Sequence, residues 1–146
     1  MTHSHYYELL DADDERGEKF SATDMVRSTW SDKIQHGGPV SALLVRGLER
    51  CARRDDTRLV RVVIDLLGPV PAEGEFWISS RIDRSGKQIE LVSTEMLARG
   101  PDGPRAVARA SGWRTLALAW AREARPSSTV WRVAAIAASR SGSRRD

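Results

Sequence analysis

The sequence predicts an α+β domain of two layers, in which one amphipathic helix covers one face of an antiparallel sheet. Two observations predict this class: a single apolar stripe with helical spacing occurs early in the chain, and four long segments with strand-like alternation follow it. The chain has 146 residues, the usual length of one domain with one core. We therefore expect one folded domain over residues 17–115, between a lead-in and a tail.

The residues before the helix are expected to form short elements only. In residues 1–16 the apolar YYELL is a lead-in or a short strand, and an acidic turn follows it. The segment EKFSATDMV, residues 18–26, has the alternation of a strand with Phe20 and Ala22 on one face. This part of the chain therefore adds at most two short strands to the sheet.

The helix is predicted over residues 39–53. Pro39 suits the first helical turn, because a backbone N–H at that position would have no intrahelical partner. The charged run RRDD is expected to end the helix. The apolar residues recur at steps of three and four and form one stripe: Val40, Leu43, Leu44, Gly47, Leu48 and Cys51.

Four strands are predicted after the helix, over residues 57–67, 75–84, 87–100 and 104–116. Short segments with proline or glycine separate them, so we expect each strand to pair with the next in an antiparallel meander. The first strand alternates between an apolar and a polar face. Its apolar face carries Val60, Val62, Ile64 and Leu66, and its polar face carries Arg61 and Asp65. The third strand alternates through Ile89, Leu91, Ser93, Glu95 and Leu97.

Composition and charge argue against several classes of protein. The chain has 40% hydrophobic residues but no apolar run near the roughly 20 residues that span a bilayer, so no membrane partner is expected. A single cysteine, Cys51, excludes an internal disulfide, and with the polar N-terminus it favours the cytoplasm. Six arginines and two acidic residues follow residue 115, so the tail carries a net charge of +4 and the rest −1. A nucleic-acid contact by this tail, residues 116–146, is the weakest alternative, and we expect no nucleic-acid partner.

The helix is preceded by His36-Gly37-Gly38, which places two poor helix formers at its start. The first N–H groups of a helix have no intrahelical partner, and the helix dipole gives them partial positive charge. Glycine lets a ligand approach the backbone closely, so this start is suited to hold an anion or a polarised carbonyl oxygen, with His36 orienting it. The alternative is structural: the glycines make a tight turn into the helix, and His36 is a partly buried cap.

These motifs, in this order, resemble the hotdog-fold acyl-CoA thioesterases, especially the thioesterase II-like branch and its thioesterase-like relatives. The resemblance spans about residues 17–115 and rests on HGGP before the helix, DLLGPVP at the end of the first long strand, RSG before the third, and AVARASG in the last. It implies a curled antiparallel sheet wrapped around one long central helix. It also implies hydrolysis of a fatty acyl-CoA thioester, whose carbonyl would be bound by the N–H of Gly37 or Gly38.

The resemblance also implies a polar residue that positions water and basic residues near the CoA phosphates, and the sequence offers candidates for them. Asp65 is expected to orient water across a subunit interface, and the alternative is a surface carboxylate paired with Arg61. Trp30 is expected to wall the acyl pocket, unless it belongs to the core. Three basic residues are expected to meet the CoA phosphates or to be ordinary strand-end charges: Arg81, Arg84 and Lys87.

Two departures from the family pattern keep a second function open. The helix has Val45-Arg46-Gly47 where many hotdog thioesterases carry an acid, and Glu49 lies off the apolar stripe. The chain also resembles only the first half of the thioesterase II-like proteins, which contain two hotdog domains in tandem. A lone hotdog is expected to form a homodimer or a higher hotdog oligomer. The alternative to an enzyme is a catalytically degenerate half-domain that binds acyl-CoA or pairs with another hotdog chain.

No cofactor is expected. The sequence has neither a dinucleotide-binding glycine motif nor a P-loop, and it has no GxSxG nucleophile motif. Its three histidines are His3, His5 and His36, which is too few and too scattered for a histidine metal site. The family to which the resemblance points uses no metal, in agreement with this expectation.

Overall fold

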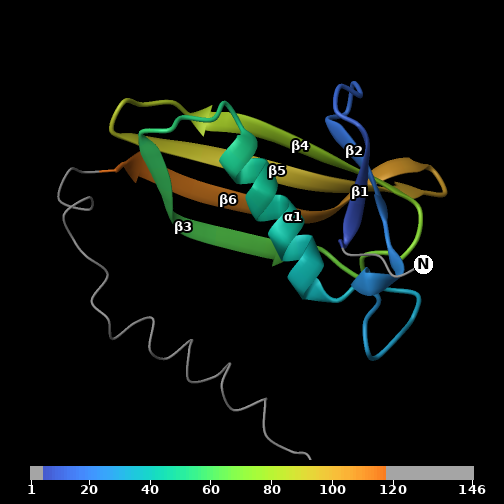
Figure 1. The fold of residues 1–146 in the computed structure, drawn as a ribbon. Helices are drawn as coiled ribbons and strands as arrows, with labels where there is room; N and C mark the ends of the chain where they lie inside the picture. Colours follow the sequence, from blue (N-terminus) through green and yellow to red (C-terminus); the bar gives the residue numbers. More distant parts are fainter. Residues whose placement is uncertain (1–4, 118–146) are drawn as a thin grey trace, which may run out of the picture. The chain divides into compact units, whose positions relative to one another are not determined.

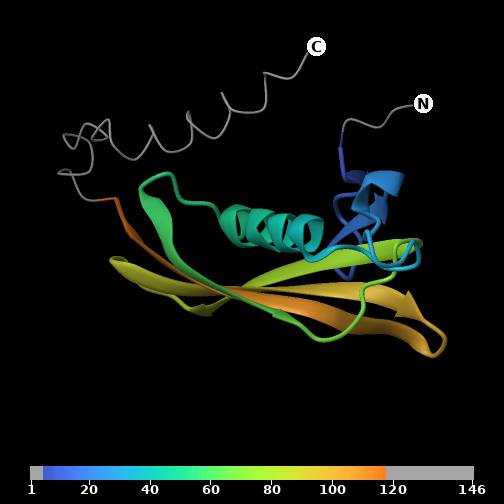
Figure 2. The same cartoon turned by 90° about the horizontal axis from the view of Figure 1, so that it is seen from below.

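The computed structural model describes residues 5–117, which form a curled antiparallel sheet of six strands with one helix on its concave face (Figures 1 and 2). This confirms the predicted hotdog fold. Beyond Leu116 and Ala117, the predicted tail lies outside the described residues. In chain order the elements are β1 Tyr7–Asp11, β2 Glu18–Ala22, the 3₁₀ helix η1 Asp24–Val26, α1 Gly37–Arg50, β3 Thr57–Leu66, β4 Glu75–Arg84, β5 Ile89–Gly100 and β6 Gly103–Leu116.

The strand order is β1-β2-β4-β5-β6-β3, and all neighbouring strands are antiparallel. β4, β5 and β6 form the predicted meander, but the prediction that β3 pairs with β4 is wrong, because β3 pairs with β6 at the far edge. The segment between β3 and β4 does not make a hairpin turn. Its backbone bonds instead to the residues before α1: Gln35 N–H donates to Val70 O at 2.8 Å, and Ala72 N–H to Lys33 O at 2.9 Å.

Helix α1 lies where the apolar stripe predicts it, with shifts at both ends. It begins at Gly37, two residues earlier than predicted, and His36 is its N-cap. It ends at Arg50, and Ala52 adopts a left-handed backbone with φ of 40°, which turns the chain away from the helix. The predicted stripe is buried against the sheet, with Cys51 packed partly buried at its end: Val40, Leu43, Leu44, Gly47 and Leu48.

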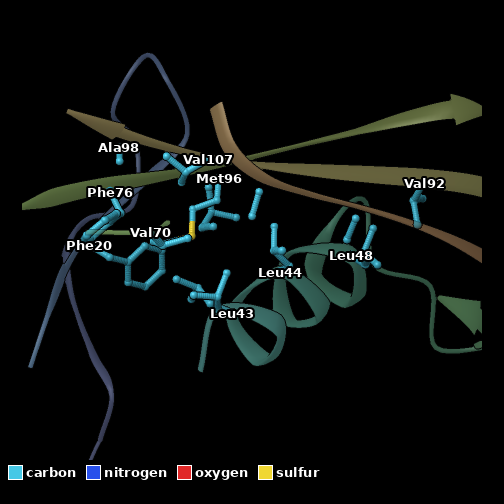
Figure 3. Close-up of a cluster of buried hydrophobic side chains, with 14 residues drawn as sticks. Phe20, Leu43, Leu44, Leu48, Val70, Phe76, Val92, Met96, Ala98 and Val107 are labelled. Carbon is cyan, nitrogen blue, oxygen red and sulfur yellow. The ribbon is translucent and has the colours of Figure 1, made fainter. Parts of the chain in front are cut away.

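The core lies between α1 and the concave face of the sheet. Figure 3 shows Leu43, Leu44 and Leu48 on the side of the helix that faces the strands, with Met96 and Val92 among the strand residues opposite. Each large apolar side chain that is fully buried in this way contributes about 1.5–3 kcal/mol. One contiguous cluster therefore fixes the helix on the sheet.

β5 buries one of its two alternating sets of side chains against the helix, and this is not the set from Ile89 to Leu97 that the sequence alternation indicated. The buried residues are Glu90, Val92, Thr94, Met96 and Ala98. The set that runs from Ile89 to Leu97 in steps of two faces away from the helix. Both sets contain large apolar residues, so alternation alone did not distinguish the core face from the outer face.

Gly47 allows the helix to approach the sheet closely. A Cβ atom at this position would lie 2.7 Å from Thr94 Cγ2 and 2.9 Å from Ile78 Cγ2, closer than real Cβ atoms pack. Beside it, the hydroxyl groups of Ser80 and Thr94 bond to each other at 2.8 Å and so satisfy two polar groups under the helix. The residue at position 47 thus sets the height of the whole helix above the strands.

β1, which falls within the predicted lead-in, forms one edge of the sheet beside β2. β2 in turn is fastened to the helix, because the Arg46 guanidinium donates to both carboxylate oxygens of Glu18 at 2.6 and 3.1 Å. Arg46 also lies over the Phe20 ring, with 5.2 Å between the guanidinium carbon and the ring centroid. These contacts give Arg46 a partner within the chain.

Candidate active site at the start of helix α1

The residue before His36 holds the start of α1 in place. Gln35 is buried, and besides its backbone bond to Val70 its side-chain Nε2 donates to Pro71 O at 2.8 Å. The Tyr7 hydroxyl donates to Gln35 Oε1, and burial raises the pKa of this phenol, so it stays a proton donor at any working pH. Three segments distant in sequence thus meet at Gln35, which fixes where the helix begins.

His36 is both an exposed side chain and the N-cap of α1. Its backbone N–H donates to Val26 O at 2.9 Å, and its ring Nδ1 accepts from Gly38 N–H at 3.3 Å. Because Nδ1 accepts, the proton of the neutral ring lies on Nε2, which is free to donate to a ligand. The Tyr6 ring packs edge-on against the imidazole, with 6.3 Å between centroids, and limits its rotation.

The two glycines have different roles in this geometry. Gly38 has its N–H occupied by the His36 ring, and a Cβ at this position would lie 2.9 Å from His36 Cε1. The N–H of Gly37 has no acceptor among residues 5–117. Since Pro39 has no N–H, Gly37 is the donor of the first turn that remains available to a ligand.

The floor of this site comes from the end of β3. A Cβ at Gly37 would lie 3.4 Å from Leu66 Cδ1, an ordinary contact distance, so the start of α1 rests against Leu66. Leu66 and Leu67 are both about half exposed, and Leu67 N–H donates to Val107 O at 3.0 Å. An oxygen bound at Gly37 would therefore have apolar surface beside it and open space in front.

Asp65 is next to Leu66 in sequence but lies on the other face of the sheet. In the β3–β6 register it stands opposite Arg109, whose guanidinium Nε donates to Glu95 Oε1 at 2.7 Å. Among the described residues Asp65 has no ion-pair partner of its own. Within one chain the structure therefore does not bring Asp65 and His36 together.

Of the predicted substrate-binding residues, Trp30 is almost fully exposed, and the three basic residues lie in the second half of β4 or just beyond it. Trp30 is 90% exposed, so within one chain it walls no pocket. Leu66, Ala108, Met96 and Ile78 are paired across the sheet in one row, in which Leu66 lies beside Gly37 at the helix start and Ile78 lies beside Gly47, nearer the helix end. Arg84 is six residues beyond Ile78 on β4, about 20 Å along the strand. Of the other two basic candidates, Arg81 is ion-paired with Asp83 at 2.8 Å, and Lys87 lies in the exposed β4–β5 turn.

The other end of α1 has two features that the sequence reading missed. The first is a buried ion pair: the Arg114 and Glu90 side chains are only 4% and 6% exposed, and Arg114 also donates to Cys51 O and Ala52 O at 2.8 and 3.2 Å. The second is a half-open hollow of about 350 Å³. It is lined by Leu48, Glu49, Arg50, Arg53, Arg54, Asp55, Thr57, Arg58, Leu59 and Arg114. Four arginines between residues 50 and 58 were the signal in the sequence that could have revealed it.

Comparison with known proteins assigns the family. A model described as the acyl-CoA thioesterase N-terminal domain matches residues 26–115, more than half of the chain. The chain therefore belongs to the acyl-CoA thioesterase family. A comparison with curated proteins found no match.

Solved structures share the fold at low sequence identity. The BH2602 protein of Bacillus halodurans, solved with CoA, is 17% identical with a TM-score of 0.55, covering 71% of this chain and 72% of that one. The smu.793 protein of Streptococcus mutans, bound to acetyl-CoA, is 14% identical with a TM-score of 0.57, covering 80% and 92%. HI0827, a hexameric broad-specificity acyl-CoA thioesterase solved as an Asp44Ala mutant, is 12% identical with a TM-score of 0.54, covering 69% and 78%.

The described residues contain neither a metal-binding cluster nor a membrane-spanning helix. Across residues 5–117, no group of three or more His, Cys, Asp or Glu side chains is arranged to hold a metal ion. No helix in that part of the chain has the length and apolar character to cross a membrane. The groups that a ligand would meet at the helix start are backbone N–H groups, the imidazole of His36 and apolar side chains.

Proposed function

We propose that this protein hydrolyses a fatty acyl-CoA thioester to the free acid and CoA. The observation that carries the proposal is the pair of donors at the start of α1: the Gly37 N–H without an acceptor and the Nε2 of the exposed His36. Donors that are fixed before the reaction stabilise an oxyanion most effectively, and Gln35 and Tyr7 fix this backbone. Membership of the acyl-CoA thioesterase family supports the substrate class.

The reaction at this site is an addition followed by an elimination. The oxygen of a water molecule adds to the thioester carbon, and the carbonyl oxygen becomes an oxyanion that accepts from Gly37 N–H. The carbon–sulfur bond then breaks, and the CoA thiolate takes up the proton that the water lost. Position 46 of the helix carries an arginine bound to Glu18, so in this proposal the group that positions the water comes from across a subunit interface.

We propose that the active form is a homodimer or a larger hotdog oligomer in the cytoplasm. β3 is an edge strand with exposed apolar side chains, and such edges need to be covered. The hexameric state of HI0827 supports oligomerisation as a property of proteins with this fold. Asp65 is exposed and faces away from its own helix, so in this proposal it acts on a substrate at His36–Gly37 only from a different subunit.

A second function is favoured by one observation: helix positions 45–47 carry no carboxylate, and Glu49 is exposed at the far end of the helix. In this alternative the protein is a degenerate half-domain that binds acyl-CoA, or pairs with another hotdog chain, without hydrolysing it. It predicts thermal stabilisation by acyl-CoA without release of thiol.

The experiment that tests the proposal is release of CoA thiol from acyl-CoAs of increasing chain length. His36→Ala removes both the cap and the donor, whereas His36→Ser keeps a side-chain acceptor for the Gly38 N–H and removes only the imidazole. If the imidazole acts on the substrate, both variants lose turnover by roughly 10²-fold. If His36 is only a cap, His36→Ser keeps the wild-type rate. Absence of multiple turnovers in folded wild-type protein would favour the degenerate half-domain.

A further inference from the structure

The hydrogen bond to Gly38 does not by itself fix the orientation of the His36 imidazole. The ring is exposed, and its Nδ1 lies 3.3 Å from the Gly38 nitrogen, which is long for a hydrogen bond. The torsion between Cβ and the ring of a histidine has a broad, roughly two-fold preference, so a half-turn of the ring is accessible. After a half-turn, a ring carbon faces the Gly38 N–H and Nε2 no longer occupies its former position. A second contact is therefore needed to keep one orientation.

The ring of Tyr6 supplies this second contact. It lies edge-on to the imidazole, with 6.3 Å between the ring centroids and 82° between the ring planes. This edge-to-face arrangement is a favoured geometry for two aromatic rings. Within residues 5–117 the Tyr6 hydroxyl has no hydrogen-bond partner, so the contact with His36 is made by the ring alone.

The backbone of Tyr6 is fixed by Thr23, the N-cap residue of the 3₁₀ helix η1. Thr23 N–H donates to Tyr6 O at 2.9 Å. The Thr23 hydroxyl lies 3.2 Å from the same oxygen and 2.8 Å from His5 O. Thr23 is only 6% exposed, so little water competes for these bonds. Tyr6 is 42% exposed, but its backbone is thus attached to a buried part of the chain.

The same short turn holds the backbone of His36. Val26 is the last residue of η1 and is fully buried. Its N–H donates to Thr23 O at 3.3 Å, and its carbonyl oxygen accepts from His36 N–H at 2.9 Å. Residues 23–26 therefore bind the backbone of Tyr6 at one end and the backbone of His36 at the other. The distance between the two rings is set by this turn, and the imidazole meets a partner that is already in place.

We propose that Tyr6 is a positioning residue for the reaction at the start of α1. Its ring holds the His36 imidazole in the orientation in which Nδ1 accepts from Gly38 N–H and Nε2 faces a bound thioester. The effect on turnover rests on the proposed function, but the orientation of the ring does not depend on turnover. Tyr6 acts through His36 and not on the substrate. Loss of its ring therefore lowers kcat and leaves KM unchanged.

The effect on turnover is tested by steady-state release of CoA thiol with the full chain. Tyr6→Leu keeps an apolar side chain but removes the ring, and it should lower kcat at least tenfold at constant KM. Tyr6→Phe keeps the ring and should stay within twofold of the wild type. Leu10→Ala, which shortens another half-exposed side chain in the same N-terminal segment, is the matched control and should change neither constant. A wild-type kcat in Tyr6→Leu, or an equal loss in Tyr6→Phe, would overturn the proposal.

A double-mutant cycle separates positioning from a general loss of stability. If Tyr6 acts only through the imidazole, Tyr6→Leu should lower kcat at least tenfold in the wild type but less than twofold in His36→Ala. Thermal melting of each variant shows whether the kinetics are those of folded protein. A tenfold loss in both backgrounds would mean that Tyr6 acts independently of His36, and the positioning role would be rejected.

The orientation of the ring is measured without turnover, by NMR of the chain labelled with ¹⁵N in its histidine rings. The chain has three histidines, so His36→Ala assigns the His36 signals by difference. Above neutral pH, a proton held on Nε2 gives two well-separated ring-nitrogen shifts, because the nitrogen that carries the proton and the one that accepts differ. Tyr6→Leu should move these shifts toward their average. Averaged shifts in the wild type, or unchanged shifts in Tyr6→Leu, would contradict the proposal.

The two measurements distinguish failure of the positioning role from failure of the proposed function. A wild type without turnover, whose His36 shifts nevertheless depend on the Tyr6 ring, would reject the hydrolase and keep the positioning role. A wild type that turns over, with Tyr6→Leu unchanged in both kcat and ring-nitrogen shifts, would keep the hydrolase and reject the positioning role.

Discussion

The two ends of helix α1 differ in how their unpaired backbone groups are satisfied. At the C-terminal end, the carbonyl oxygens of Cys51 and Ala52 accept from Arg114, and Arg114 is held by buried Glu90. At the N-terminal end, the Gly37 N–H has no acceptor among the described residues, and the His36 ring is exposed. A helix end that the chain closes with its own buried side chain is structural, whereas one that it leaves open is available to a ligand. The following predictions test this contrast, from the largest expected effect to the smallest.

The largest effect is expected at the closed end. Arg114→Leu leaves the Glu90 carboxylate buried without a partner and leaves the carbonyl groups of Cys51 and Ala52, just past the helix end, without this donor. We expect the free energy of unfolding to fall by about 3–5 kcal/mol, measured by urea denaturation. Arg109→Leu is the matched control, because Arg109 pairs with Glu95 between the same two strands but is exposed; it should cost at most about 1 kcal/mol. Equal losses for the two variants would contradict the structural role of the closed end.

The next effect concerns the two glycines that face neighbouring side chains. Gly47→Ala places a methyl group within 3 Å of Thr94 and Ile78 side-chain atoms, and we expect it to lower the free energy of unfolding by about 1–3 kcal/mol. Gly37→Ala meets only Leu66, at 3.4 Å, so its unfolding free energy should stay within about 0.5 kcal/mol of the wild type. Thermal melting of both variants checks this difference. Similar melting temperatures would mean that helix and sheet are not in close contact at Gly47.

A smaller effect is expected where Tyr7 holds Gln35. Tyr7→Phe keeps the ring, which packs against Phe20 at 6.5 Å between centroids, and removes the hydroxyl that donates to Gln35. The free energy of unfolding should fall by about 1 kcal/mol. If Gln35 positions His36, turnover should fall while KM stays constant, and Tyr6→Phe should leave both unchanged. A change in KM alone would instead place Tyr7 in substrate binding.

The smallest effect concerns the thiol at the closed end. Burial raises the pKa of Cys51, so at neutral pH less of it is thiolate than in a free cysteine. The rate of labelling by a thiol reagent should be lower than that of a cysteine-containing model peptide at pH 7–8. It should also keep rising with pH beyond the pH at which the labelling rate of the peptide levels off. Stopped-flow labelling across this range measures it. Labelling as fast as the peptide's would show that the C-terminal end of α1 is open.

Features that depend on neighbouring residues could be predicted from the sequence, whereas features that depend on contacts between distant segments could not. The helix stripe was predictable because residues three and four apart necessarily share a helix face, and the polar face of β3 was predictable because side chains alternate. The role of Gly37 as the open donor was not. It depends on whether the His36 ring turns toward Gly38, and Tyr6, from a distant segment, limits that rotation.

The sequence by itself determined the class of fold, the position of α1 and the presence of a helix start suited to an oxygen ligand, because these depend on residues close together in the chain. Only the tertiary structure decided that β3 leaves β4 for the far edge of the sheet, which face of β5 is buried, and that Arg84 lies far from His36. It also decided that four arginines near the end of α1 line one hollow. The physical reason is that strand pairing and burial depend on contacts between residues far apart in the chain, and local alternation carries no information about the partner.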